Sequence, residues 1–161
     1  MAASIRFRPA TPAEGLAELR LLIELPAVRR LADRGLSDQE LSLLQQLADA
    51  TMRAACGRDV PDYFRTDMAF HLGLLELTSG PAHSQVARLV LASDRTRPPE
   101  ISDYYLMARK AREHSELVGL LADGLVSPAD QLLRLHLSRL SASRPASAHF
   151  AQSESLSAAG A

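Results

Sequence analysis

The sequence has little of what disulfide-bonded, nucleic-acid-binding and membrane proteins rely on. It contains no tryptophan and a single cysteine, Cys56. One cysteine excludes an intrachain disulfide and a thiolate metal cluster, so a reducing compartment is the simplest interpretation. The formal net charge is -1 at pH 7, which leaves no basic excess to attract nucleic acid or an anionic membrane.

Long apolar runs are missing as well. No stretch approaches the roughly 20 apolar residues that cross a bilayer, and the first residues lack the apolar run of a signal peptide. We therefore expect a soluble, cytoplasmic protein. The 161 residues fit one domain with a sizeable core, and 47% of them are hydrophobic. Glycine and β-branched residues are scarce while leucine and alanine are frequent, which favours helices.

Helix start and stop signals recur along the chain at short intervals. Ser37-Asp38-Gln39-Glu40 is a capping box, and Pro12 and Pro61 stand where the first turn of a helix accepts proline. Pro26 lies inside the first predicted helix and should kink it or split it in two. The signals predict six helical segments, approximately over 11–34, 37–56, 59–79, 81–94, 100–123 and 127–142.

The predicted fold is all-α, because no segment shows the alternation of a strand. No internal repeat is visible either. Short loops between the segments favour an antiparallel bundle of six to seven helices. We expect a flexible N-terminus over 1–13 and the helical domain over 14–142. From Ser143 the chain is rich in serine and alanine without apolar periodicity, which predicts a disordered tail over 143–161.

Ionisable residues fall on the apolar faces of three predicted helices. Asp67 and His71 are four residues apart and share the apolar stripe of the third helix. His114 lies on a stripe that begins with Met107, and leucines flank His136 on the last helix. Three helices therefore direct ionisable side chains toward the predicted core.

A divalent cation would satisfy these four side chains together. A buried carboxylate or imidazole is costly without a partner, and zinc, nickel and manganese all accept imidazole nitrogens and carboxylate oxygens. Zinc is the first choice. The plainer interpretation is a set of separate hydrogen-bonded or surface residues. Each residue alone supports only that, and their joint occurrence on inward stripes favours the metal.

The remaining candidates are weaker. Arg20 and Glu24 could form a surface ion pair, or they could reach into the bundle, where Arg20 would suit a carboxylate ligand. We expect His83 and His149 at the surface, and Cys56 packed near a helix end. No phosphate-binding glycine loop and no Ser/His/Asp or Cys/His constellation is found, so no catalytic residue is predicted.

The pattern of these residues resembles a known family, the FCD domain, which is the C-terminal effector-binding domain of FadR-type regulators in the GntR family. The resemblance covers about residues 14–142. Its motifs are an Arg and a Glu four residues on, an Asp-x3-His motif, a Glu-His pair and a final His 22 residues later, here Arg20, Glu24, Asp67, His71, Glu113, His114 and His136.

The resemblance implies a function and a ligand set. In the metal-binding branch of the family, an Asp and three His hold a divalent metal beside a pocket for a small organic acid. Carried over, this makes Asp67, His71, His114 and His136 the metal ligands and Arg20 a ligand-binding residue. The implied protein is a non-enzymatic sensing domain of a transcription regulator, with a small carboxylate effector and a second copy of itself as partners.

Two departures from the family pattern bear on this expectation. The turn after the third helix reads Ser79-Gly80-Pro81, where the family has an Asn after the Gly. Fewer than about twenty residues precede the first helix, too few for the winged helix-turn-helix domain of family members. We therefore expect DNA binding only through a domain missing from this chain. The alternatives are a small metal-dependent hydrolase or isomerase and a ligand-free dimerisation module.

Overall fold

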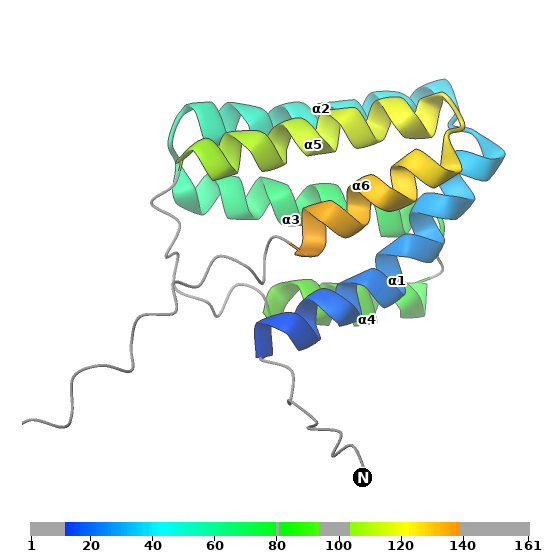
Figure 1. Cartoon of the computed structure of the whole chain (residues 1–161), viewed down its shortest axis with the longest axis horizontal. Coiled ribbons are helices and arrows are strands. Elements are labelled where there is room, and N and C mark those ends of the chain that lie inside the picture. The colour runs from blue at the N-terminus through cyan, green and yellow to red at the C-terminus, as the bar shows by residue number, and fades with distance from the viewer. Residues whose placement is uncertain (1–11, 80, 94–103, 139–161) are drawn as a thin grey trace, which may run out of the picture.

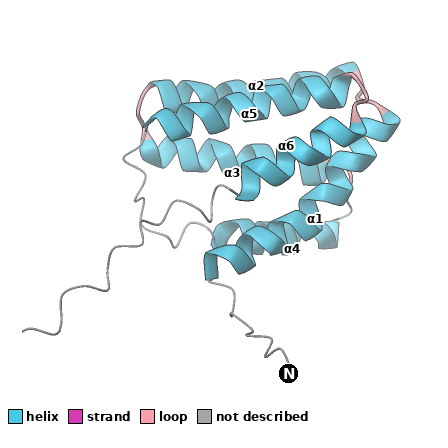
Figure 2. Ribbon diagram, viewed as in Figure 1, coloured by secondary structure: helices cyan, strands magenta, loops and turns pink. Residues whose placement is uncertain are grey.

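The computed structural model describes residues 12–79, 81–93 and 104–138, which form a bundle of helices (Figure 1). In chain order the helices are α1 (Pro12–Arg34), α2 (Asp38–Cys56), α3 (Val60–Glu76), α4 (Pro81–Ser93), α5 (Tyr104–Ala122) and α6 (Val126–Ser138). The described residues contain no strand (Figure 2), so the predicted all-α bundle is confirmed. None of these described helices combines the length and apolar character needed to cross a membrane.

Neighbouring helices run antiparallel in the main body of the bundle. α2 packs against α3 and α5, and α1 packs against α6, as Figure 1 shows. α4 lies at the edge, where it contacts α1 and α3. Each of the five helices other than α4 contributes a fully buried leucine to the main core: Leu31, Leu44, Leu74, Leu121 and Leu133.

The predicted helix-start signals form the hydrogen bonds that are expected of helix caps. The Ser37 hydroxyl accepts from the Glu40 backbone N–H at 3.3 Å, and the Ser37 N–H donates to the Glu40 carboxylate at 2.9 Å. This is the reciprocal capping box predicted for α2. At the start of α3 the Asp59 carboxylate accepts from the Asp62 N–H at 3.0 Å. Both caps satisfy backbone donors that a helix start leaves without partners.

Pro26 does not split the first helix, since α1 continues through it to Arg34. Proline removes the N–H that would donate to the carbonyl four residues earlier, at Leu22. Pro26 and Leu22 both lie on the exposed side of α1. Water can therefore donate to the Leu22 carbonyl in place of the missing N–H, and the helix continues through Pro26.

Some predicted helix boundaries differ from the structure. The third helix ends at Glu76 rather than at Ser79, and the Thr78 backbone N–H donates to the Leu75 carbonyl three residues back, at 3.2 Å, which tightens the last turn. The last helix begins at Val126, one residue before its expected cap at Ser127. The expected starts at 11 and 100, the expected end at 142 and the tail over 143–161 lie outside the described residues. Pro12 and Ala13, placed in the flexible N-terminus, belong to α1.

Gly124 closes α5 in the left-handed region, with φ +68°. A side chain there would be strained, and its Cβ would lie 3.4 Å from the Ala32 carbonyl oxygen. Gly119 is the opposite case, since it lies inside α5 on the exposed side, where an added Cβ would meet no atom within 4 Å. The two glycines thus differ in whether their positions tolerate a methyl group.

We predict that Gly124→Ala lowers the free energy of unfolding by about 1–2 kcal/mol, because alanine is disfavoured in the left-handed conformation. Gly119→Ala should raise it by about 0.5–1 kcal/mol through helix propensity. Urea unfolding followed by circular dichroism measures both. Equal stabilities for the two variants would contradict the assignment of Gly124 as the conformational stop of α5.

Candidate metal centre

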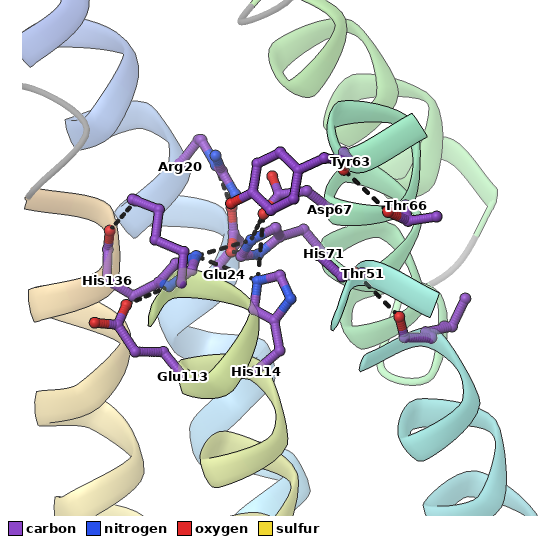
Figure 3. A network of polar contacts seen from close by, with 12 residues as sticks. Arg20, Glu24, Thr51, Tyr63, Thr66, Asp67, His71, Glu113, His114 and His136 are labelled. Atoms are coloured by element: carbon purple, nitrogen blue, oxygen red, sulfur yellow. Dashed lines mark hydrogen bonds and ion pairs between the residues drawn. The ribbon is translucent and has the colours of Figure 1, made fainter. Parts of the chain in front are cut away.

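The four predicted ligand residues meet in the interior of the bundle (Figure 3). Asp67 and His71 come from α3, His114 from α5 and His136 from α6. One ligand atom of each residue lies within 4.8 Å of those of the other three, so the cluster could hold a metal ion. The three histidines are buried, whereas the Asp67 side chain is 18% exposed and is the part of the cluster nearest to solvent.

The distances within the cluster match those between ligands of one ion. Nε2 of His136 lies 3.2 Å from Nε2 of His71 and 3.3 Å from Nε2 of His114. Oδ1 of Asp67 lies 3.4 Å from Nε2 of His114 and 3.9 Å from Nε2 of His71. Ligands in a tetrahedron at about 2.0–2.1 Å from zinc are about 3.3–3.4 Å apart. Three of these four distances are therefore close to the edge of such a tetrahedron, and the 3.9 Å distance between Asp67 and His71 is longer.

Two buried carboxylates fix which ring nitrogens face the centre. Oε2 of Glu24 lies 2.7 Å from Nδ1 of His71, and Oε2 of Glu113 lies 2.8 Å from Nδ1 of His136. An ionised carboxylate only accepts hydrogen bonds, so Nδ1 of each ring carries the proton and Nε2 carries a lone pair. This is the carboxylate–histidine arrangement that orients metal ligands in proteins.

His114 is held in a different way. Its ring stacks on Phe70, with 4.0 Å between ring centroids and 13° between ring planes. Its Nδ1 is buried and has no hydrogen-bond partner among the described residues. Packing on an aromatic ring, rather than a carboxylate, therefore sets the orientation of this third imidazole.

Two cations are buried beside the cluster. Nε of Arg20 donates to Oε1 of Glu24 at 2.7 Å, and both side chains are almost fully buried. Of the two alternatives for this pair, the one that reaches into the bundle is therefore confirmed. Nζ of Lys110 donates to the His136 carbonyl oxygen at 2.9 Å.

Sequence reasoning did not assign Lys110 and Glu113 to the site. Their positions along α5 could have indicated that they face the site. Lys110 is four residues before His114 and so shares its face, while Glu113 is one helical turn after Lys110. Both are buried in the structure, as the stripe on this helix would have indicated.

Burial keeps the three histidines neutral. Desolvation is the main cause that lowers the pKa of each imidazole well below its ordinary value. The charge of Arg20 comes next for His71, the neighbouring His136 for His114, and Lys110 for His136. Burial and the charge of Asp67 raise the pKa of Tyr63, whose ring faces the cluster (Figure 3). Neutral imidazole is the form that binds metal ions.

The remaining residues that the sequence singled out are not part of the described cluster. The Cys56 side chain is exposed rather than packed, because it stands in the last turn of α2 on the solvent side. The His83 side chain, His149 and Gly80 of the variant turn lie outside what the structure describes. Among the described residues, the cluster around Asp67 is therefore the candidate functional site.

The comparison with protein families agrees with the resemblance seen in the sequence. The family model of the FCD domain matches residues 15–139. The chain belongs to the FCD domain family. FCD domains are the regulatory, effector-binding domains of GntR-type regulators; they bind small effectors and dimerise. The buried Asp67/His cluster of this FCD domain is consistent with the metal-binding branch of the family. A search of curated proteins gave no match.

Proposed function

We propose that this FCD domain senses a small organic acid through a divalent metal ion held by Asp67, His71, His114 and His136. The observation that carries the proposal is the 3.2 Å separation of Nε2 of His71 from Nε2 of His136. Both nitrogens present lone pairs, which repel each other and cannot form a hydrogen bond. A cation between the two nitrogens would attract both lone pairs and so remove the repulsion. A module without a ligand offers no explanation for two lone pairs placed this close.

The charges around the cluster favour an anionic effector. Counted as ionised, the carboxylates of Asp67, Glu24 and Glu113 and the cations Arg20 and Lys110 leave one net negative charge. A divalent ion, zinc by first choice, would change this to one net positive charge in a buried setting and would polarise a bound carboxylate. The partly exposed Asp67 gives the side from which an acid could approach.

Arg20 is the proposed second contact for the acid. Its guanidinium is a planar fork that matches a carboxylate, and it is buried beside the cluster rather than on the surface. The effector we propose is therefore a small carboxylate, and the domain is a sensing part of a GntR-type transcription regulator rather than an enzyme.

Metal removal should destabilise the fold. We predict that saturating chelator lowers the melting temperature, because a metal that binds only the folded state stabilises it by about 4 kcal/mol at a thousand times its dissociation constant. Asp67→Ala and His136→Ala should retain less zinc than the wild type in elemental analysis. His83→Ala is the control and should retain the wild-type amount. Equal zinc content in all four proteins would contradict the ligand set.

Carboxylates should act through the metal. We predict that acetate and succinate raise the melting temperature of the zinc-loaded protein more than that of the chelator-stripped protein, at matched ionic strength with chloride as the control anion. The physical reason is that the net positive charge exists only in the loaded form. Equal shifts in both forms would show that the acid does not contact the metal.

We also propose that the domain forms a homodimer through α1 and α4. These helices contact each other at the edge of the bundle and carry exposed apolar side chains: Leu19 is 50%, Leu22 is 72% and Val86 is 55% exposed. Exposed apolar side chains on two neighbouring helices favour a protein interface at these helices. Dimerisation in the FCD family supports a second copy as the partner.

Leu22→Glu should weaken the dimer, because it places a charge in an apolar interface. We expect the wild type to sediment as a dimer at micromolar concentration and Leu22→Glu as a monomer. Leu43→Glu on α2 is the matched control, since it is also an exposed leucine but lies on a different helix, and it should remain dimeric. A wild type that is monomeric, or a control that dissociates instead, would contradict the proposed face.

A further inference from the structure

A continuous chain of buried side chains links α1 to the metal centre. Nε of Arg20 donates to Oε1 of Glu24 at 2.7 Å, and Oε2 of Glu24 lies 2.7 Å from Nδ1 of His71. Figure 3 shows the three side chains in sequence. Glu24 thus uses one oxygen for a cation and the other for a metal ligand, while its own side chain is fully shielded from solvent.

We propose that Glu24 is a positioning residue that couples Arg20 to His71, so that Arg20 sets the metal affinity without touching the metal. This inference rests on the proposed function, because it requires that His71 is a metal ligand. It goes beyond that function by assigning Arg20 a second role toward the metal, separate from the acid that Arg20 would bind.

The physical basis is the cost of burying the Glu24 carboxylate. A buried carboxylate is stable only when it is paired and hydrogen-bonded. Arg20 supplies the opposite charge and fixes the plane of the carboxylate, which in turn fixes the ring of His71. Loss of an outer-shell partner of this kind typically weakens metal binding about 10–100-fold.

The cluster contains a second carboxylate–histidine pair, which can be compared with the pair of Glu24 and His71. Glu113 holds His136 at 2.8 Å much as Glu24 holds His71. Oε1 of Glu113 lies 4.0 Å from Nε of Arg109, whose side chain is 39% exposed. Solvent screens such a pair, so we expect Arg109 to influence the metal much less than Arg20.

The coupling has a regulatory consequence. An acid that engages Arg20 would share its guanidinium with Glu24 and would thereby change how firmly His71 is held. By linkage, the metal must change the affinity for the acid by the same factor. Arg20 and Glu24 stand on α1, which also carries the proposed dimer face around Leu22, so the acid and the dimer are connected through one helix.

The test is a pair of double-mutant cycles on zinc affinity, measured with the full chain by competition against a chromophoric chelator. Arg20→Gln and Glu24→Gln should each weaken zinc binding about 10–100-fold. The double variant Arg20→Gln/Glu24→Gln should be no weaker than Glu24→Gln alone, because Arg20 acts through Glu24. Arg20→Gln/Glu113→Gln should show the product of its two single losses, because these residues act on different ligands.

Several outcomes would overturn the inference. Unchanged zinc affinity in Arg20→Gln, or multiplied losses in Arg20→Gln/Glu24→Gln, would show that Arg20 does not act through Glu24, while the metal site itself would stand. A wild type that binds no zinc would overturn the metal site and the coupling together. If Arg20→Gln does not fold by circular dichroism, Arg20→Lys serves instead; it keeps the charge but loses the fork. Losses of zinc affinity that multiply in Arg20→Lys/Glu24→Gln would then overturn the coupling.

Discussion

The bundle depends on one constraint, which is that charged and ionisable side chains are buried where four helices meet. Each of α1, α3, α5 and α6 brings such a group to the same interior point, and none of these groups is stable there alone. The carboxylates of Glu24 and Glu113 orient two imidazoles, and Phe70 packs against the third. The contacts that pack these four helices together are therefore also the contacts that set the geometry of the site.

Much of this could be predicted from the sequence because helical phase is a strong signal. Caps such as Ser37 fix where a helix begins, and a four-residue step places Asp67 and His71 on one face. Phase alone does not reveal which helices face one another. The contacts of Glu24 with His71 and of Glu113 with His136 join residues 47 and 23 positions apart, so they follow from tertiary packing.

The errors of prediction have local causes. The end of α3 is a tightened turn in which the Thr78 N–H donates to the Leu75 carbonyl three residues back, a feature that a search for glycine stops overlooks. Lys110 escapes sequence reasoning because a lysine is expected on the surface, although here its amine meets the backbone of His136 in the interior. The Lys110 side chain thus bonds to the backbone rather than to solvent.

Pro26 gives α1 a mechanical property that the other helices lack. One backbone hydrogen bond of α1 is missing, the one that would join Pro26 to the Leu22 carbonyl on either side of Glu24, which weakens the resistance of the helix to bending at this point. The segment beyond it is tied to α6 by Arg29 and Asp130, at 2.8 Å, whereas the segment before it carries Arg20 and Glu24. A tilt of the first segment about this point would move the arginine and the carboxylate together, and it would shift the Glu24 oxygen that lies 2.7 Å from Nδ1 of His71.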